Sequence, residues 1–317
     1  MKDKTILITG GTGSFGQTLT RILLDEYNPK SVRIYSRGEF LQSEMQKKFN
    51  DGRLRFLIGD VRDRDRLIRA CFGVEVVVHA AALKQIVTAE YNVFEAIKTN
   101  IDGSLNVIDA AIENNIPQII GISSDKATAP CNLYGATKMV MEKAFIQSNV
   151  YSNWSRFSCT RYGNVVGSRG SVVPLFKEQA KTGEITITDK DMTRYFLTLE
   201  QGARFVLDCL KVMKGGEIFV PKIPSMEVMD LADVIAPKAK RKIVGIRPGE
   251  KLHEVLITEE ESRHALEYEN YYLIEPEFQF WEQNKPEGGI RVKKGFTYTS
   301  ENNEEWLSKE EIERMAK

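Results

Sequence analysis

Tyr134 and Lys138 have side chains and a spacing that could carry out proton chemistry. They stand in the segment NLYGATK, and their spacing places both side chains on one face of a helix, one turn apart. A phenol titrates at about 10 in water, but a neighbouring ammonium favours the phenolate and lowers that pKa. Tyr134 is therefore a candidate base that takes the proton of a hydroxyl group. A solvated surface pair is the alternative, because this spacing is common.

An acid and a base stand side by side in the segment SSDKA. Ser124, Asp125 and Lys126 follow an apolar run over residues 117–123. Oxidation of an alcohol needs one base and a hydride acceptor, so a further acid and base indicate further proton transfers. An elimination needs them, because one proton leaves carbon while another goes to the departing oxygen. The alternative is a solvated Asp–Lys turn before a helix.

The elements that must hold these residues follow a regular alternation. Short apolar runs predict strands, and a 3.6-residue periodicity predicts helices between them. Strands are predicted over residues 4–9, 31–36, 54–58, 74–80, 117–123 and 156–162. Helices are predicted over residues 15–27, 39–49, 63–71, 93–114 and 135–149. The alternation predicts an α/β fold with a Rossmann-type doubly wound parallel sheet, whose carboxyl edge brings the Asp–Lys pair and the tyrosine together.

A glycine-rich turn follows the first predicted strand. Gly10, Gly13 and Gly16, in TGGTGSFG, open the first predicted helix. This context predicts a dinucleotide site, because the glycines let the backbone approach a pyrophosphate and the helix N-terminus binds its charge. Further residues expected at this site are Thr12, Ser14, Phe15, Asp60, Val61, Ala80, Ala81 and Ala82. For the three alanines, simple close packing is the alternative.

The end of the second predicted strand distinguishes the two nicotinamide cofactors. An acid there binds the ribose 2′-hydroxyl of NAD, whereas a basic residue accommodates the 2′-phosphate of NADP. Ser36 and Arg37 stand at this point and offer hydrogen-bond donors and a positive charge. We therefore expect NADP. If the strand ran further, Glu39 could serve as the NAD acid.

Beyond Gly163 the alternation loosens into glycines, prolines and short strands, with a clear helix over residues 199–213. An NADP-binding domain is predicted for residues 1–165 together with about 191–213. A smaller, discontinuous C-terminal substrate lobe is predicted for residues 166–190 and 214–280, followed by a polar tail of residues 281–317 that ends in a short helix. The lobe is expected to cover the carboxyl ends of the strands, where open α/β sheets bind ligands.

The composition argues against several classes of protein. The 317 residues are 42% hydrophobic and 28% charged, as in an ordinary globular protein. Lysine plus arginine and aspartate plus glutamate both number 44, so no overall charge favours nucleic acid or an anionic membrane. The sequence shows neither a signal peptide nor a membrane span, and its cysteines and histidines form no metal pattern. We expect a cytoplasmic protein without metal, nucleic acid or membrane partners.

Longer motifs closely resemble those of the inverting UDP-N-acetylglucosamine 4,6-dehydratases, within the extended short-chain dehydrogenase/reductase family. They run from about residue 3 to residue 275 and include TGGTGSFG, YSRGE, GDVRD, HAAALK, SSDKA, NLYGATK, RYGNVVGSRGSVVP, GGEIFVPKIPSM and IRPGEKLHE. The resemblance implies NADP that stays bound and is recycled in each turnover, with Lys84, Tyr134 and Lys138 among its contacts. It also implies the opening step of pseudaminic acid biosynthesis, which serves polysaccharide or flagellin glycosylation.

The same resemblance implies a role for each catalytic residue. Tyr134, beside Ser124, takes the 4-hydroxyl proton as hydride leaves C4, and the new ketone acidifies C5. Lys126 then removes the C5 proton, and Asp125 protonates the departing 6-hydroxyl. Hydride returns to C6, and protonation of C5 from the opposite face gives the 4-keto-6-deoxy-L-arabino sugar. The residues implied to bind the UDP-sugar are Lys84, Asn164, Arg169, Ser171, Val172, Arg194, Arg247 and Glu250.

Departures from the family pattern leave alternatives open. Ser124 replaces the usual threonine, QIVTAEYN follows Lys84 where a histidine and a proline are typical, and APCN stands where NPxN is usual. A dehydratase that retains the C5 configuration or releases a 5,6-ene intermediate is therefore one alternative. A UDP-sugar 4-epimerase, which has no work for Asp125 and Lys126, is another, and a non-catalytic NADP-sensing protein is a third. Apolar positions beyond one face of the helices near 93–114 and 135–149 predict a homo-oligomer, a dimer or larger.

Overall fold

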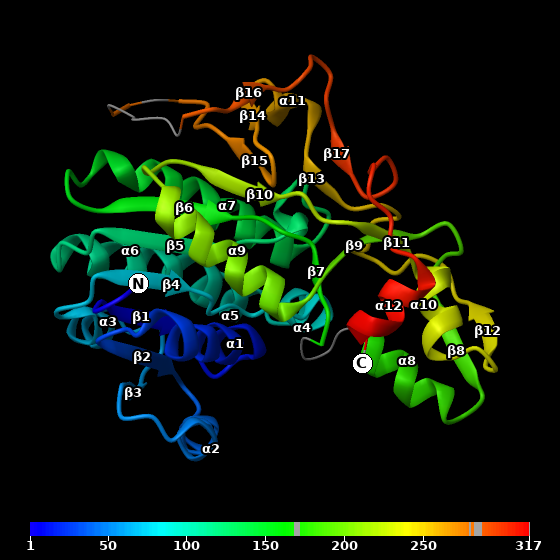
Figure 1. Ribbon diagram of the computed structural model, residues 1–317, viewed down its shortest axis with the longest axis horizontal. Coiled ribbons are helices and arrows are strands. Elements are labelled where there is room, and N and C mark those ends of the chain that lie inside the picture. The colour runs from blue at the N-terminus through cyan, green and yellow to red at the C-terminus, as the bar shows by residue number, and fades with distance from the viewer. Residues whose placement is uncertain (168–171, 279, 282–286, 317) are drawn as a thin grey trace.

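A ten-stranded sheet runs through the centre of the computed structural model, which describes residues 1–167, 172–278, 280–281 and 287–316 (Figure 1). Seven neighbouring strands pair in parallel, in the order β3 (Leu54–Ile58), β2 (Ser31–Ser36), β1 (Thr5–Thr9), β4 (Val76–His79), β5 (Gln118–Ile122), β6 (Arg156–Thr160) and β10 (Ile218–Pro221). The chain runs from β1 out to β3 and returns to β4 on the other side of β1. This reversal confirms the predicted doubly wound sheet, and ligands bind such sheets at the reversal.

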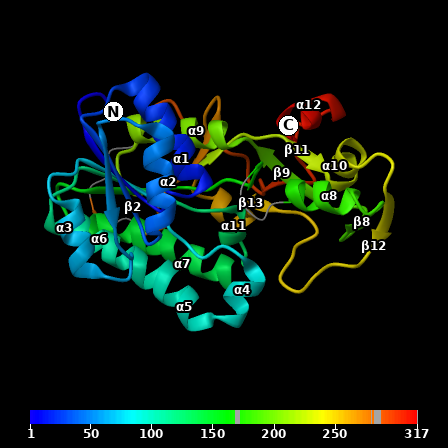
Figure 2. The ribbon, with the colours of Figure 1, turned by 90° about the horizontal axis from the view of Figure 1, so that it is seen from below.

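Helices cover both faces of this sheet (Figure 2). One layer contains α1 (Ser14–Ile22), α2 (Glu39–Phe49) and α9 (Leu199–Val212). The other contains α3 (Arg64–Cys71), α4 (Ile86–Tyr91), α5 (Val93–Ile97), α6 (Gly103–Glu113) and α7 (Leu133–Gln147). With both faces covered, β1 and β4 are buried at every position, which explains their continuous apolar sequence. The helix predicted over residues 93–114 is α5 and α6, joined by a wider π-helical turn over Lys98–Asp102.

A smaller lobe lies beyond the carboxyl ends of the parallel strands (Figure 1). Its strands are β7 (Asn164–Val165), β9 (Thr193–Leu197) and β11 (Ser225–Glu227) in one sheet and β8 (Glu184–Ile187) and β12 (Lys240–Ile243) in another. Its helices are α8 (Val172–Ala180), α10 (Val228–Ile235) and α12 (Lys309–Ala316). Phe176, Ile187, Leu231 and Ile312 belong to an apolar core separate from that of the main sheet.

The C-terminal third differs from the predicted division. Residues 214–280 do not all lie in the lobe, because β10 joins the parallel strands and an antiparallel run extends them. That run consists of β15 (Tyr271–Ile274), β14 (Ala265–Glu267) and β16 (Ile290–Arg291). Residues 281–317 are not a simple surface tail either. There β17 (Tyr298–Thr299) pairs with β13 (Val255–Ile257), which precedes α11 (Glu259–Ser262), and Ile312 of the amphipathic α12 is fully buried.

Candidate active site

A cavity of about 870 Å³ opens at the carboxyl ends of the parallel strands and is bounded on its other side by the lobe. Most of the predicted site residues line it: Gly10, Thr12, Gly13, Ser14, Phe15, Gly16, Arg37, Ala80, Ala81, Ala82, Lys84, Ser124, Asp125, Lys126, Tyr134, Lys138, Asn164, Val172, Arg194, Arg247 and Glu250. Ser36, Asp60 and Val61 lie outside this lining, and Arg169 and Ser171 lie outside the described residues. The sheet edge and the lobe thus bring together residues that are far apart in the sequence.

The glycine turn has the close approaches that a dinucleotide site requires. Gly10 has a φ of +67°, and a Cβ atom there would lie 2.9 Å from the backbone of Ala81. A Cβ atom on Gly16 would lie 2.5 Å from the backbone of Gly11. Among the described residues no side chain caps α1, so its first N–H groups are available to a phosphate. The turn therefore fits a pyrophosphate, and Ala81 both packs against Gly10 and lines the cavity.

The end of the second strand is the position that distinguishes NAD from NADP in dinucleotide-binding folds. β2 ends at Ser36 and α2 begins at Glu39, so the strand does not run on to the glutamate. Ser36 Oγ accepts a hydrogen bond from Thr12 Oγ1 at 3.2 Å. The Arg37 side chain is 56% exposed at the cavity rim, with Nη1 3.8 Å from Asp60 Oδ2. This arrangement presents a hydroxyl and an exposed positive charge, the chemistry that suits a phosphate.

Asp60, Val61 and His79 are engaged by the protein itself. The Asp60 carboxylate accepts a hydrogen bond from Arg62 at 2.7 Å, and Val61 packs against Gly103. His79 is fully buried and contacts hydroxyl groups through both ring nitrogens, as expected for a packed residue at a strand end. Within the part of the chain that the structure describes, no three His, Cys, Asp or Glu side chains form a group that could hold a metal ion.

The Asp–Lys pair sits on a short 3₁₀ turn, Asp125–Ala127, anchored to the end of the sheet. The Asp125 backbone N–H donates to the Tyr162 carbonyl at 3.1 Å, which continues the pairing of β5 with β6. Ser124 caps the turn, because its Oγ accepts from the Lys126 N–H at 3.1 Å and donates to Asp125 Oδ1 at 2.7 Å. The Ser124 hydroxyl thus satisfies both the backbone of the turn and the Asp125 carboxylate.

The tyrosine helix packs tightly against this turn. Asn132 caps α7 by accepting a hydrogen bond from the Gly135 N–H at 2.8 Å. A Cβ atom on Gly135 would lie 2.1 Å from the Lys126 carbonyl oxygen, so a side chain there would push α7 away. The glycine in YGATK therefore lets Tyr134 lie beside the Asp–Lys turn. Both Tyr134 and Lys138 are buried, at 9% and 3% exposure.

The electrostatics of Tyr134 differ from the expectation. Burial raises the pKa of Tyr134 to about 12, against the opposing influence of the Lys126 ammonium and a hydrogen bond with Ser124. The cation that favours its phenolate in this structure is thus Lys126, and the lowering of this pKa by Lys138 together with a bound nicotinamide ring stays a prediction. Lys138 Nζ instead donates to the Ile122 carbonyl at 2.7 Å, and burial lowers the pKa of Lys138 to about 8.

Lys126 lies between two carboxylates. Its Nζ is 3.1 Å from Asp125 Oδ1 and 3.4 Å from Glu254 Oε1. Burial acts to lower the pKa of Lys126, but these two carboxylates outweigh it and hold that pKa above its ordinary value. Lys126 is therefore charged at neutral pH in this arrangement. Glu254 was not predicted from the sequence as a site residue, although it is the last residue of the motif IRPGEKLHE.

The predicted substrate residues fall into two groups. Asn164 and Lys84 present side chains to the cavity: Asn164 Oδ1 is buried without a hydrogen-bond partner among the described residues, and burial lowers the pKa of Lys84. Arg247 lies at the rim, with its side chain 52% exposed and Nη1 4.0 Å from Glu250 Oε1. Arg194 is already engaged, because it donates to the backbone oxygens of residues 251 and 252, each at 2.9 Å. Arg194 thus holds a cavity loop in addition to any substrate contact.

The buried ammonium of Lys138 should lower the free energy of unfolding of the protein. The pKa of Lys138, about 8, lies below its ordinary value of 10.5. Below pH 8 the amine is protonated in both the folded and the unfolded protein, and its burial then destabilises the folded protein. Between these values the unfolded state binds more protons, and wild-type stability should rise with pH. Lys138→Met should raise the free energy of unfolding at pH 7 by about 1–3 kcal/mol and remove that rise. Urea denaturation at pH 7 and 10 measures both effects.

The control for this prediction is Lys47→Met, because the Lys47 side chain is 74% exposed on α2 and its replacement should leave stability unchanged. A Lys138→Met protein less stable than wild type at pH 7 would contradict the prediction. That result would mean that the hydrogen bond from Lys138 to Ile122 outweighs the cost of burying the ammonium.

Comparison with known sequences finds relatives that work on nucleotide sugars. The family model described as polysaccharide biosynthesis protein matches residues 6–276. The chain is 51% identical, over 98% of its length and 96% of the relative, to the UDP-N-acetylglucosamine 4,6-dehydratase (inverting) of Campylobacter jejuni. It is 41% identical, over 99% of its length and 95% of the relative, to a UDP-glucose 4-epimerase of Rickettsia massiliae.

Solved structures share the fold over all or most of the chain. The X-ray structure of Pen from Bacillus thuringiensis aligns with a TM-score of 0.91 at 39% identity and covers 99% of this chain and 97% of that chain. The dTDP-glucose 4,6-dehydratase DesIV from Streptomyces venezuelae, solved with NAD bound, aligns with a TM-score of 0.71 at 20% identity, over 78% of this chain and 86% of that chain. The second likeness supports the fold alone, which is the Rossmann-type arrangement expected from the sequence.

Proposed function

The chain belongs to the polysaccharide biosynthesis protein family, and from this premise we propose that it is an inverting UDP-N-acetylglucosamine 4,6-dehydratase. The observation that carries the proposal is the Asp125–Lys126 turn, packed against Tyr134 in the wall of one cavity. Oxidation at C4 needs a base for one hydroxyl proton, and elimination needs a second base and an acid. All three groups border the same space. A 4-epimerase needs only the first.

NADP is the proposed cofactor, tightly bound and recycled, and when bound it would accept hydride from C4 and return it to C6. The glycine turn and the N-terminus of α1 would hold its pyrophosphate. Ser36 and Arg37 would contact its 2′-phosphate. Tyr134 and Lys138 would also contact the cofactor, and Lys84 would contact both cofactor and sugar.

The chain's own residues would move the protons. Tyr134 accepts the 4-hydroxyl proton, with Ser124 as its hydrogen-bond partner. Lys126 must be neutral to take the C5 proton, and Asp125 must be protonated to release water from C6. Transfer of one proton from Lys126 Nζ to Asp125 Oδ1, 3.1 Å away, produces both states together without exchange with solvent. The residues proposed to bind the UDP-sugar are Lys84, Asn164, Arg169, Ser171, Val172, Arg194, Arg247 and Glu250.

Arg37 should decide the preference for NADP. Arg37→Ala removes the positive charge at the end of β2, and it should weaken NADP binding about 10-fold while NAD binding changes little. Titration calorimetry with both cofactors measures the two dissociation constants. Arg21→Ala, which removes an arginine that pairs with Glu200 on the surface, is the control and should bind both cofactors as wild type does. Equal loss of NADP and NAD affinity in Arg37→Ala would contradict the assignment.

The experiment that tests the function is incubation of the purified protein with UDP-N-acetylglucosamine and NADP in heavy water. We expect a product lighter by one water, with deuterium at C5 and the L-arabino configuration in proton NMR spectra. A product of unchanged mass with inverted C4 would identify a 4-epimerase. Retained C5 configuration or a released 5,6-ene would identify the corresponding dehydratase variants. NADP binding without any turnover would identify a sensing protein.

The setting of the reaction is also proposed. The expected product suits pseudaminic acid biosynthesis and polysaccharide or flagellin glycosylation in the cytoplasm. A homo-oligomer is proposed because α5, α6 and α7 expose apolar side chains, among them Phe94 at 78% and Leu105 at 45%. Among the described residues, no helix is long and apolar enough to span a membrane.

A further inference from the structure

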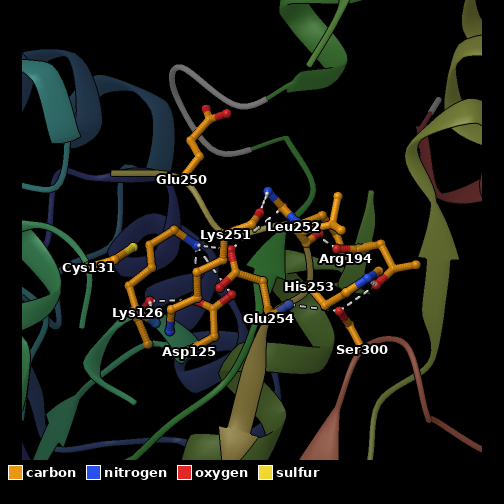
Figure 3. Close-up of polar contacts among 12 residues, drawn as sticks. Asp125, Lys126, Cys131, Arg194, Glu250, Lys251, Leu252, His253, Glu254 and Ser300 are labelled. Carbon is orange, nitrogen blue, oxygen red and sulfur yellow. Dashed lines mark hydrogen bonds and ion pairs between the residues drawn. The ribbon is translucent and has the colours of Figure 1, made fainter. Parts of the chain in front are cut away.

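Glu254 is a buried carboxylate in the cavity wall that the proposed reaction does not use. It is 3% exposed, and its Oε1 lies 3.4 Å from Lys126 Nζ and 3.5 Å from Arg194 Nε. Figure 3 shows the carboxylate between these two cations and beside Asp125. Its Oε2 is buried and has no hydrogen-bond partner among the described residues. A buried carboxylate is costly unless it is paired, so the two cations explain how it persists there.

Segments far from Lys126 in the sequence set the position of Glu254. Its backbone N–H donates to Ser300 Oγ at 2.9 Å, and Ser300 belongs to the segment that follows β17. The Arg194 guanidinium fixes the preceding loop through two backbone oxygens, each at 2.9 Å. These contacts, visible in Figure 3, leave the carboxylate facing Lys126. These distant segments thus place a negative charge beside the Lys126 amine at the sheet edge.

We propose that Glu254 is a positioning residue for the elimination: it holds the Lys126 side chain at the cavity and stabilises the ammonium that forms as Lys126 takes the C5 proton. This inference rests on the proposed dehydratase function. In the step, the C5–H bond breaks, its proton bonds to Lys126 Nζ, and its electron pair forms the C5–C6 double bond. The C6–O bond breaks, and the oxygen leaves as water with the proton of Asp125.

Asp125 cannot supply this stabilisation at the start of the step, because it must then be protonated and uncharged. Glu254 donates no proton in the step and keeps its charge. Burial and the Arg194 guanidinium both act to lower the pKa of Lys126, whereas the Asp125 and Glu254 carboxylates raise it. Without Glu254, Lys126 would face burial, Arg194 and the nearby Lys84 with no fixed counter-charge as its ammonium forms.

Glu254→Gln tests this role because the amide has the same shape but no charge. Its kcat for water loss should fall about 10- to 100-fold, while KM for UDP-N-acetylglucosamine changes less than about 3-fold. The deuterium isotope effect with substrate labelled at C5 should increase, because C5 deprotonation becomes slower relative to the other steps. Absorbance at 340 nm should show reduced cofactor accumulating in the first turnover, since C4 oxidation is intact. Glu254→Asp, which keeps the charge, should recover part of kcat.

Two controls separate the possible outcomes. Glu217→Gln removes another fully buried carboxylate, one that bonds to Ser158 Oγ and to the backbone at residues 214 and 215 outside the cavity, and it should turn over as wild type does. Wild-type protein that releases no water would refute the proposed function itself. If wild type is active, a Glu254→Gln protein with unchanged kcat or unchanged C5 isotope effect would overturn the inference. Failure of both Glu254 variants to fold would also overturn it, because Glu254 would then serve the stability of the fold.

Discussion

Replacing Lys126 with alanine should lower the rate of water loss by about 10³-fold and leave C4 oxidation in place. Lys126 Nζ is the amine that the Asp125–Ala127 turn presents to the cavity, beside Tyr134, the proposed base for C4 oxidation. Without it, no C5 base remains, whereas Tyr134 can still accept the 4-hydroxyl proton. Substrate deuterated at C4 should therefore exchange its label with the cofactor while its mass shows no loss of water. Mass spectrometry and proton NMR follow the two processes separately.

A matched control for this variant is Lys222→Ala. The Lys222 side chain is 26% exposed, against 23% for Lys126, and Lys222 Nζ pairs with Glu267 at 2.7 Å outside the cavity lining. Its removal should leave both reactions at wild-type rates. Lys126→Ala should also melt at a lower temperature, because Asp125 and Glu254 lose a shared counter-ion. Rates are therefore compared per cofactor-binding site, and unimpaired dehydration by Lys126→Ala would remove Lys126 from the mechanism.

The features that the sequence predicted are those fixed by local pattern. The strands β1 to β6 and most helices between them follow from apolar periodicity broken by turns, and the observed bounds lie within about five residues of the predicted ones. The short helix α4 was not predicted. The glycine turn was predictable because Gly10 needs a positive φ and Gly16 a close approach, both properties of short segments. The position of Tyr134 beside the Asp–Lys turn follows from the shared carboxyl edge of a parallel sheet.

The features that the sequence did not predict depend on contacts between distant segments. Glu254 reaches Lys126 across 128 positions, and Ser300 fixes Glu254 from a segment expected to be a surface tail. Local pattern also could not show that Arg194 donates to the carbonyl oxygens of residues 251 and 252, because these residues are about 58 positions away in the sequence and meet Arg194 only in the folded chain. The same limit applies to pKa values, since the burial that dominates Tyr134 depends on packing against the whole cavity wall.

Tyr134 is the residue whose replacement should lower the reaction rate most. Its pKa of about 12 in this structure means that little phenolate exists at neutral pH, so the rate of C4 oxidation should rise with pH as the phenolate forms. The positive charge of Lys126 acts in the same direction by favouring the phenolate. A bound nicotinamide ring would add a second positive charge. The reaction thus depends on charges placed around one hydroxyl group.

Tyr134→Phe should lower turnover by about 10³- to 10⁴-fold and abolish the exchange of C4 deuterium that Lys126→Ala retains. Phenylalanine fills the same space, so NADP affinity should change less than about 3-fold, and the rise of rate with pH should disappear. Tyr272→Phe is the control, because Tyr272 is also 9% exposed but lies on β15, outside the cavity lining, and its variant should react as wild type does. Stopped-flow absorbance at 340 nm isolates the oxidation step. If Tyr134→Phe still reduced the cofactor at the wild-type rate, another group would have to accept the 4-hydroxyl proton. The proposed division of roles, with Tyr134 as the base for oxidation and Asp125 and Lys126 as the pair for elimination, would then be wrong.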